Sequence, residues 1–497
     1  MTANAPRSGR LPRLSRAHLP APQADVQLPP DAELTEVIGI VHLGICAFHR
    51  AHQALMTQDA AVSTGDTRWG ICGVTQRSRT VVDQLRPQDG LYTVLERGRS
   101  HSSARIVAQV SDVLFAAQEG DRLLHRLAHP ATHIVTMTVT EKGYPTGQRG
   151  GLDRSDDAVA HDLTRRSRGQ AGSRSVIGQL VRGLQARADS DAGPITVMSC
   201  DNLTDNGAIL QRLVEDFCYA LPSGEGEDIA AFVAASVTFP CSVVDRIVPA
   251  TTDQDRAEVE ALLGVRDEAL VVAEPYRQWV IEDHFAGPRP AWERAGAMFV
   301  DDVAPYGQLK LRILNGTHSM LAYLGALAGH DTIAEAVADP RLRHAAEALV
   351  RDDVIPTLHV PTGIDPQEYA GQVLDRFANP ALGHRTTQVA MDGSRKLPVR
   401  LLPTARDRLA AGHVPDSVAL AVAGWMAYVA KATDAAGRPL PLEDPLAPLL
   451  HRTVRDAGSD PRSITAALLD LPEIFGADLP DHQAFAGAVT THLKELL

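Results

Sequence analysis

The 497-residue sequence has few cysteines, few aromatic residues and no long hydrophobic run, and its acidic residues outnumber its basic ones. Five scattered cysteines without a CxxC pair predict a reducing compartment and no structural zinc site. The longest apolar segment, Val418 to Ala430, is too short to cross a membrane and predicts a buried helix. A net charge of −13 argues against a nucleic-acid partner, because phosphate binding needs a basic surface.

The first thirty residues contain four arginines, but no apolar stretch follows them, so the sequence predicts no secretory signal. We therefore expect a cytoplasmic protein without a membrane partner. We also expect a monomer or a small homo-oligomer.

Lysine is the scarcest of the charged residues, because only five of the 48 basic residues are lysines. A coding bias toward arginine explains the imbalance. Under such a bias a lysine inside a chemically suggestive motif is informative, because a partly buried lysine can lose its proton whereas arginine cannot. Lys310 and Lys396 therefore draw attention.

The N-terminal half alternates apolar runs with helical stretches, which predicts an α/β domain with a parallel sheet. The predicted strands are Val37 to Leu43, Trp69 to Val74, Leu91 to Leu95, Arg105 to Val110, His133 to Val139, Ile195 to Ser199 and Ser242 to Ile247. The predicted helices include Gly120 to Leu127, Ser175 to Ala188 and Asn206 to Tyr219. The segment Thr146 to Gly172 is predicted to be a surface excursion.

Beyond about Pro305 the pattern becomes almost entirely helical. The predicted helices there include Leu309 to Leu327, Pro340 to Asp352, Pro415 to Ala430 and Ser463 to Leu469. We predict a mobile tail over residues 1–30, an α/β domain over residues 31–296 and a mostly α-helical domain over residues 297–497.

The segment Ile38 to Ala60 reads as a strand, a tight turn at Gly44 and a helix, which is the context that dinucleotide binding requires. Its GxGxxG pattern is incomplete, because Cys46 and His49 replace the second and third glycines. From this motif alone, a βαβ unit without a nucleotide is about as plausible.

Two segments resemble metal sites, and we reject both. His49 and His52 have helical spacing but no further ligand nearby, and a polar helix start explains them better. In the segment from Asp201 to Gly207, Leu203 occupies a position that a calcium loop would give to a ligand. We therefore predict no bound metal.

The segment KLRILNGTH, from Lys310 to His318, is the strongest local constellation. On a continuous α-helix Asn315 lies well round from Lys310, and His318 falls between them. The trio suffices for alcohol oxidation, because a neutral lysine takes the hydroxyl proton while amide and imidazole groups hold the oxygen. A polar helix face in solvent is an equally good explanation from these residues alone.

The sequence resembles the long-chain mannitol dehydrogenase family, which includes mannitol 2-dehydrogenases, arabinitol dehydrogenases and fructuronate reductases. Six ordered motifs carry the resemblance: Ile40 to Ala54, Thr138 to Tyr144, Ser199 to Gly207, Val244 to Thr251, Lys310 to Gly325 and Met391 to Arg400. The resemblance implies an N-terminal Rossmann-type doubly wound α/β domain for the cofactor and a mostly α-helical C-terminal domain for the substrate.

The resemblance also implies roles for the residues of the catalytic constellation. Lys310 matches the general acid/base of the family, and Asn202 and Asn315 match the asparagines that polarise the substrate oxygen. His318 matches a histidine that orients the substrate. Contacts to substrate hydroxyl or carboxylate groups are implied for Arg395 or Lys396 and for Arg400.

The implied cofactor is NAD, with NADP as an alternative. Its contacts are expected at the turn after the first strand, at the end of the second strand and at one carboxylate near the lysine: Gly44, Ile45, Cys46, Ala47, Phe48, Thr75, Arg77 and Asp245. The family has glycine where this chain has Cys46, so we expect the thiol to crowd the pyrophosphate. No acidic residue ends the second strand, where one normally binds the ribose 2′-hydroxyl, and Arg77 or Arg79 suits a 2′-phosphate instead.

The segments His384 to Arg400 and Val422 to Val429 resemble the fructuronate reductase branch, so we predict the interconversion of D-mannonate and D-fructuronate. The cluster of Arg395, Lys396 and Arg400 also suits an anionic sugar acid. Mannitol or arabinitol is the alternative substrate, and a sugar phosphate such as mannitol 1-phosphate is a weaker third. A non-catalytic nucleotide-binding protein is the alternative from another class.

Overall fold

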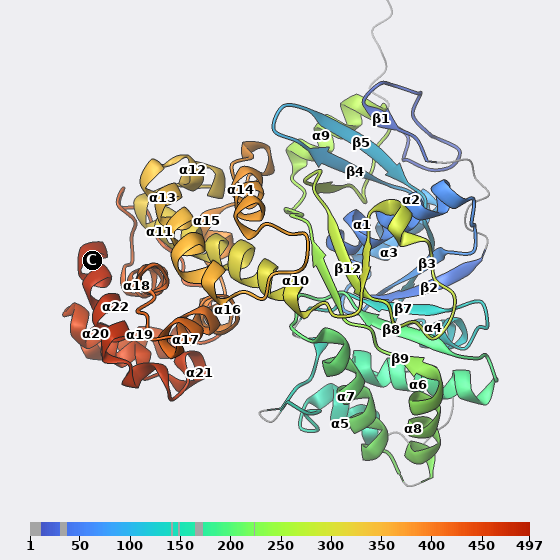
Figure 1. Cartoon of the computed structure of the whole chain (residues 1–497). Coiled ribbons are helices and arrows are strands. Elements are labelled where there is room, and N and C mark those ends of the chain that lie inside the picture. Colours follow the sequence, from blue (N-terminus) through green and yellow to red (C-terminus); the bar gives the residue numbers. More distant parts are fainter. Residues whose placement is uncertain (1–10, 30–36, 141–142, 148–149, 165–171, 223) are drawn as a thin grey trace, which may run out of the picture. The chain divides into compact units, whose positions relative to one another are not determined.

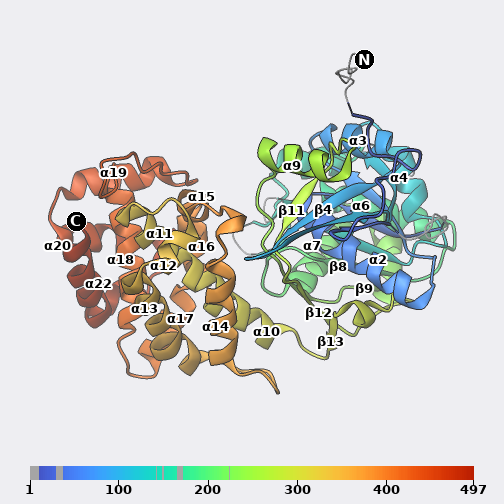
Figure 2. The same cartoon turned by 90° about the horizontal axis from the view of Figure 1, so that it is seen from above.

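The computed structural model describes residues 11–29, 37–140, 143–147, 150–164, 172–222 and 224–497. The chain divides into two compact units, Met1–Val303 and Ala304–Leu497, whereas the sequence placed the division between residues 296 and 297. Within the described ranges, every strand belongs to the first unit, and the second unit is built from helices (Figures 1 and 2).

A six-stranded parallel sheet forms the centre of the first unit, in the spatial order β6-β3-β2-β7-β8-β9. Its strands are β2 Ile38–Leu43, β3 Gly70–Thr75, β6 Val110–Phe115, β7 Ile134–Met137, β8 Ile195–Ser199 and β9 Val237–Thr238. The sequence runs outward from β2 on one side and from β7 on the other, which is the doubly wound order of dinucleotide-binding folds. Ligands of such sheets bind where the order reverses, here at the carboxyl ends of β2 and β7.

Successive side chains of the central strands point to opposite faces of this sheet, as the strand geometry requires. The helices of the first unit are α1 Ala47–Ala51, α2 Gln53–Thr64, α3 Thr80–Leu85, α4 Gly120–Leu127, α5 Asp157–Thr164, α6 Val176–Asp189, α7 Asn206–Ala220, α8 Glu225–Ser236 and α9 Asp253–Leu263. Val41 and Leu43 face a core with α4, α6, α7 and α8, whereas Ile40 faces a core with α2 and the Trp279–Trp292 pair.

Two smaller sheets complete the first unit. They differ from the sequence prediction at two strands, those predicted at Arg105 and at Ser242. They contain β1 Val26–Gln27, β4 Tyr92–Arg97, β5 Ser102–Val107 and β11 Val271–Ala273 in one, and β10 Ser242–Asp245, β12 Gln278–Glu282 and β13 Met298–Val300 in the other. The single strand predicted from Arg105 to Val110 is wrong, because β5 ends and β6 begins within it. The strand predicted at Ser242 pairs antiparallel with β12 outside the parallel sheet.

The prediction of a mobile tail is wrong for residues 11–29, which pack on the first unit. Leu14 is fully buried, and its N–H donates to the carbonyl of Arg266 at 2.8 Å. Strand β1 pairs in parallel with β5. Residues 1–10 and 30 of the predicted tail lie outside the described residues.

The predicted surface excursion from Thr146 to Gly172 contains helix α5. Its Asp162 is buried and accepts hydrogen bonds from the N–H groups of Arg174 and Ser175, which ties α5 to the start of α6. Residues 148–149 and 165–171 lie outside the described residues.

The second unit is helical, as predicted. Its helices are α10 Ala304–Leu309, α11 Gly316–Ala328, α12 Ile333–Ala338, α13 Pro340–Ala348, α14 Pro366–Phe377, α15 Thr386–Ala390, α16 Gly393–Arg400, α17 Leu402–Ala410, α18 Asp416–Ala430, α19 Ala447–Ala457, α20 Pro461–Leu469, α21 Pro472–Phe475 and α22 Gln483–Leu496. The apolar helix α18 is buried against α11 and α22. A Cβ on Gly424 would lie 2.9 Å from Leu324 Cδ2, so this glycine permits the close approach of α18 to α11. No helix among the described residues is long and apolar enough to cross a membrane.

Candidate active site

Gly44 makes the turn after β2 in a conformation that favours glycine. Its φ is +96°, and a Cβ there would lie 2.2 Å from the backbone oxygen of Thr138. The N–H groups of Gly44 and Ile45 both donate to the carbonyl of Val74, at 2.8 and 3.0 Å, and the Thr138 hydroxyl donates to the Gly44 carbonyl at 2.9 Å. The turn is therefore held between β3 and the end of β7, where the strand order reverses.

Cys46 occupies the position of the missing second glycine without backbone strain. Its φ of −116° and ψ of −177° are extended values that any residue adopts. The half-buried Sγ lies 3.5 Å from Thr138 Oγ1, so the thiol is directed toward the residue that follows β7. The cost of a side chain at this position is therefore its bulk alone.

The other predicted residues of the turn divide into buried and half-buried positions. The side chain of Ile45 is buried and packs over Gly73, where a Cβ would lie 2.4 Å from Ile45 Cδ1. Ala47 and Phe48 are half-buried in the first turn of α1, where backbone N–H groups have no intrahelical partner. The start of α1 thus offers backbone N–H donors of the kind that bind a pyrophosphate, next to a turn that sterically requires glycine at Gly44.

The three histidines of this motif, His42, His49 and His52, are buried. The rings of His42 and His49 stack at a centroid distance of 3.4 Å, and the ring nitrogens of His42 contact the hydroxyls of Thr136 and Thr138. Burial lowers the pKa of both His42 and His52 to about 3, so both rings are neutral near pH 7. Among the described residues, no three histidine, cysteine or acidic side chains are grouped as metal ligands would be.

Asn202 follows β8 and is exposed, whereas its neighbour Asp201 is buried. The Asp201 carboxylate accepts hydrogen bonds from the N–H groups of Val139 and Thr140, at 3.0 and 2.9 Å, and from the Tyr144 hydroxyl at 2.8 Å. Asp201 therefore ties the segment after β7 to the segment that carries Asn202. The sequence analysis assigned no role to Asp201. Glu141 and Lys142, in the motif from Thr138 to Tyr144, lie outside the described residues.

Asp245 is the last residue of β10 and is buried. At the end of β3, Thr75 is buried and its hydroxyl donates to the carbonyl of Leu114 at 3.4 Å. Arg77 and Arg79 follow in an exposed segment.

Lys310, Asn315 and His318 lie in the second unit on a helix with an unusual pitch. Lys310–Asn315 forms a π-helix between α10 and α11. Residues five apart point about 140° away from each other on an α-helix, but a π-helix has i→i+5 hydrogen bonds and brings them to one side. The expectation that Asn315 lies well round from Lys310 is therefore wrong, because it assumed an α-helix.

The trio is buried, although all three side chains are polar: Lys310 is 7% exposed, Asn315 6% and His318 8%. Asn315 Nδ2 and His318 Nε2 have no hydrogen-bond partner among the described residues. Leaving a buried polar group unpaired costs about 1–3 kcal/mol, so two such groups beside a buried lysine indicate a place for a polar ligand. The alternative of a polar helix face in solvent is wrong.

His384 and Phe377 complete the surroundings of His318. The His318 ring stacks on Phe377 at 4.6 Å and meets the His384 ring edge-on at 4.9 Å. Burial, followed by the charges of neighbouring basic groups, lowers the pKa of His318 well below its ordinary value. Burial and the charge of Lys396 lower the pKa of His384 to about 4. Because His384 is far from His318 in the sequence, spacing gives no signal that the two rings meet.

Two of the three predicted substrate contacts share one side of α16. Lys396 and Arg400 are four residues apart, half-buried, and near enough to His318 to affect its pKa. Arg400 donates to Ser319 Oγ at 3.2 Å, and Lys396 donates to the Val389 carbonyl at 3.0 Å. Arg395 is exposed and is not part of this group.

Family models match nearly the whole chain. The mannitol dehydrogenase Rossmann domain matches residues 38–294, and the mannitol dehydrogenase C-terminal domain matches residues 302–497. The chain belongs to the mannitol dehydrogenase family. The family, the fold class and the oxidoreductase class predicted from the sequence are therefore confirmed.

Relatives of this mannitol dehydrogenase family member match most of its length. D-mannonate oxidoreductase of Escherichia coli is 43% identical over 463 residues, covering 92% of this chain and 93% of the relative. Mannitol 2-dehydrogenase of Pyrenophora tritici-repentis is 35% identical over 466 residues, covering 92% and 79%. The solved mannitol 2-dehydrogenase of Pseudomonas fluorescens, in a ternary complex with NAD and D-mannitol, is 35% identical and has a TM-score of 0.87 over 97% of this chain and 96% of that chain.

Proposed function

We propose that the chain is an NAD-dependent oxidoreductase that interconverts D-mannonate and D-fructuronate. The observation that carries this proposal is the pair of unpartnered buried groups, Asn315 Nδ2 and His318 Nε2, beside the buried Lys310. Such groups bind a substrate hydroxyl or carbonyl oxygen without first losing other partners. The 43% identity to D-mannonate oxidoreductase supports the sugar acid as the substrate.

In this proposal Lys310 takes the proton of the substrate hydroxyl during oxidation and returns it during reduction. Asn315 and His318 hold the oxygen while it gains negative charge, and both fit because their nitrogens have no competing partner. A bound nicotinamide would supply the hydride acceptor for the substrate carbon that carries this oxygen. The contribution of Asn202 to this oxygen stays a prediction from the resemblance.

The first unit fits NAD, because its doubly wound strand order reverses at the Gly44 turn and the first turn of α1 offers backbone donors. The Pseudomonas fluorescens relative binds NAD with the same fold. The cytoplasmic location and the monomeric or small oligomeric state stay predictions.

Lys396 and Arg400 supply the preference for an acid substrate, because two cations on one side of α16 suit a carboxylate. Mannitol remains the second candidate, because the Pseudomonas fluorescens relative binds it and has a TM-score of 0.87 to this chain. A sugar phosphate would also suit two cations, but no relative named above acts on one.

The test is a titration with NADH followed by turnover assays with fructuronate, fructose and xylulose. We expect kcat/KM to be highest with fructuronate. A higher value with fructose or xylulose would assign the chain to the polyol branch. NADH binding without turnover on any of the three would favour the non-catalytic alternative.

A matched pair of variants on α16 tests the carboxylate contact. Arg400→Ala should raise KM for fructuronate by about tenfold or more, the value of one hydrogen bond to a charged group, with a smaller effect for fructose. Arg395→Ala removes the same charge from an exposed position and should leave both values unchanged. Equal effects of the two variants would contradict the proposed contact.

Metal removal tests the proposed chemistry from another side. Because Lys310 supplies the proton transfer, we expect full activity after prolonged dialysis against EDTA. Loss of activity that returns only with added zinc would contradict the prediction of a metal-independent enzyme.

A further inference from the structure

The end of β3 lies beside the Gly44 turn at the carboxyl edge of the sheet. The Val74 carbonyl accepts the N–H groups of Gly44 and Ile45, and the Thr75 carbonyl accepts the N–H of Ala116 at 3.0 Å. In a dinucleotide-binding βαβ unit, the end of the second strand meets the ribose of the adenosine, where an acidic side chain binds the 2′-hydroxyl of NAD. Residues 75–82 of this chain contain no aspartate or glutamate, but they contain Arg77 and Arg79.

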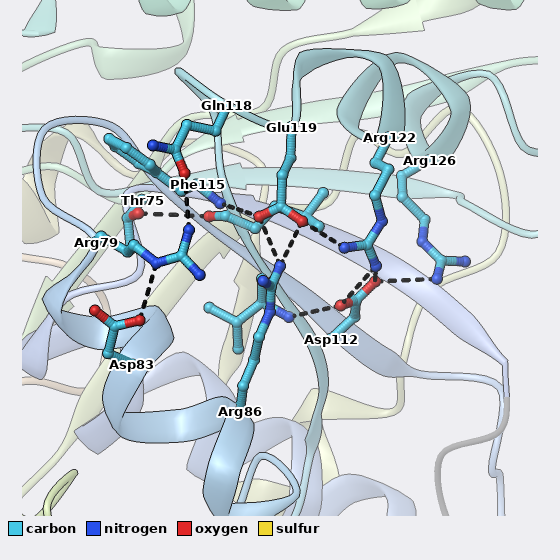
Figure 3. Close-up of polar contacts among 12 residues, drawn as sticks. Thr75, Arg79, Asp83, Arg86, Asp112, Phe115, Gln118, Glu119, Arg122 and Arg126 are labelled. Atoms are coloured by element: carbon cyan, nitrogen blue, oxygen red, sulfur yellow. Dashed lines mark hydrogen bonds and ion pairs between the residues drawn. The ribbon is translucent and has the colours of Figure 1, made fainter.

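The carboxylates that surround this edge are already engaged by arginines, as Figure 3 shows. Asp83 accepts a hydrogen bond from Arg79 Nε at 2.9 Å, and Asp112 pairs with Arg122 and Arg126. Glu119 pairs with Arg86 and Arg122, each at 2.6 Å.

The lowered pKa of Glu119 shows that the arginines of this cluster stabilise its ionised carboxylate. Desolvation opposes ionisation of Glu119, but hydrogen bonds from the Phe115 N–H, Arg86 and Arg122 outweigh it and lower its pKa to about 2. A ribose hydroxyl would therefore have to compete with ion pairs for these oxygens.

The two arginines after β3 differ from those in the cluster. Arg77 is exposed and has no hydrogen bond or ion pair with any described residue. Arg79 donates through Nε to Asp83 and through Nη1 to Gln118 Oε1 at 2.7 Å, which fixes its guanidinium at the same edge (Figure 3). The local charge that meets the adenosine ribose is therefore positive.

We infer that the nucleotide site of this chain accepts NADP(H) as well as NAD(H), with Arg77 as the main contact to the 2′-phosphate and Arg79 as a second, fixed cation. Guanidinium groups bind phosphate through charged, bidentate hydrogen bonds, which Arg77 can make without breaking an existing pair. This inference rests on the proposed dinucleotide-dependent function and deepens it.

The experiment measures dissociation constants of NADH and NADPH with the full-length protein by fluorescence titration. We expect NADPH to bind at least as tightly as NADH at low salt, and its affinity to fall more steeply as salt is added. Arg77→Ala should weaken NADPH about tenfold more than NADH, and Arg77→Lys should restore part of the difference. Arg68→Ala, at the opposite end of β3, removes the same charge and should leave the ratio unchanged.

A competition experiment isolates the 2′-phosphate. 2′,5′-ADP should displace NADPH more effectively than 5′-AMP, and Arg77→Ala should remove most of that difference. If NADH binds and NADPH does not, or if Arg77→Ala weakens both equally, the inference is overturned while the proposed function stands. If neither nucleotide binds, the proposed function fails and the inference fails with it.

Discussion

The turn after β2 and the helix that begins at Lys310 differ in whether their polar groups have hydrogen-bond partners. At the turn, the N–H groups of Gly44 and Ile45 and the Thr138 hydroxyl all have partners within the first unit. In the second unit, Asn315 Nδ2 and His318 Nε2 are buried without partners among the described residues. These groups of the turn are therefore paired without a ligand, whereas the helix leaves two buried nitrogens unpaired for the proposed substrate.

The difference separates two tasks. A preformed turn binds a dinucleotide through its shape and its backbone, so its sequence requirement is steric. The unpaired groups on the helix cost stability, and proteins accept such a cost mainly where chemistry needs it. Substitutions in the two regions should therefore affect different measured quantities.

The largest effect is expected at Lys310. Lys310→Ala should lower kcat by about 10²–10⁴-fold, because it removes the group that moves the proton, and should leave NADH affinity nearly intact. Lys310→Arg should be almost as damaging, because arginine keeps the charge but cannot act as a base. Stopped-flow turnover and NADH titration measure the two quantities separately.

The matched control for Lys310 is Lys494→Ala, which removes an exposed lysine from α22 of the same unit. It should leave kcat unchanged. Comparable turnover in Lys310→Ala and Lys494→Ala would refute the role of Lys310.

The next effect is expected at the turn itself. Gly44→Ala should abolish measurable NADH binding and lower the melting temperature, because its Cβ would meet the Thr138 carbonyl in addition to the strain of a positive φ. Gly65→Ala is the control, since Gly65 also has a positive φ, of +70°, but open space around its Cβ. It should cost only the strain, about 1–3 kcal/mol, and retain NADH binding. Equal behaviour of the two variants would contradict the steric account of the turn.

A smaller effect concerns the buried histidines of both regions. Folding lowers the pKa of His42 to about 3 and that of His384 to about 4, from an ordinary value of 6.5. As the pH falls below 6.5, the unfolded chain binds protons that the folded chain does not, so stability falls by about 1.4 kcal/mol per pH unit for each such histidine. Above pH 6.5 these histidines contribute no further change.

Urea unfolding between pH 7.5 and 5 measures this slope. His384→Asn should make the slope shallower, whereas His413→Asn, at an exposed position, should leave it unchanged. An unaltered slope in His384→Asn would show that His384 is not held neutral by the fold.

The order of the elements could be predicted from the sequence, because it depends on local patterns. The roles of the site residues were implied by the family resemblance and stay predictions. Helix α4 and strand β8 have the predicted bounds, and the strand, turn and helix around Gly44 follow from a buried run that ends in glycine. The pairing of β10 with β12 could not be predicted, because periodicity does not say which strand lies beside which.

The candidate site exceeded the sequence prediction where contacts join distant residues. The π-helix brings Lys310 and Asn315 to one side, and the sequence of the segment does not predict that change of helical pitch. The contact of His384 with His318 and the hydrogen bonds of Asp201 likewise depend on tertiary packing. By contrast, the grouping of Lys396 with Arg400, and the exclusion of Arg395, follow helical spacing once α16 is known.

The smallest effect is expected at Cys46, where the preformed turn departs from its family. Because Cys46 has extended backbone angles, Cys46→Gly relieves no strain and acts only by removing the side chain. We predict that the thiol crowds the pyrophosphate, so that Cys46→Gly tightens NADH binding by a few fold and thiol reagents inactivate the enzyme unless NADH protects it.

The 3.5 Å contact of Sγ with Thr138 Oγ1 gives the opposing account, in which the thiol packs against the end of β7. In that case Cys46→Gly leaves NADH affinity unchanged and lowers stability by about 0.5–1 kcal/mol, through the added freedom of glycine in the unfolded chain. Cys46→Ala decides between the two, since alanine removes the thiol without that added freedom. If Cys46→Ala leaves NADH affinity at the wild-type value, crowding by the thiol is ruled out.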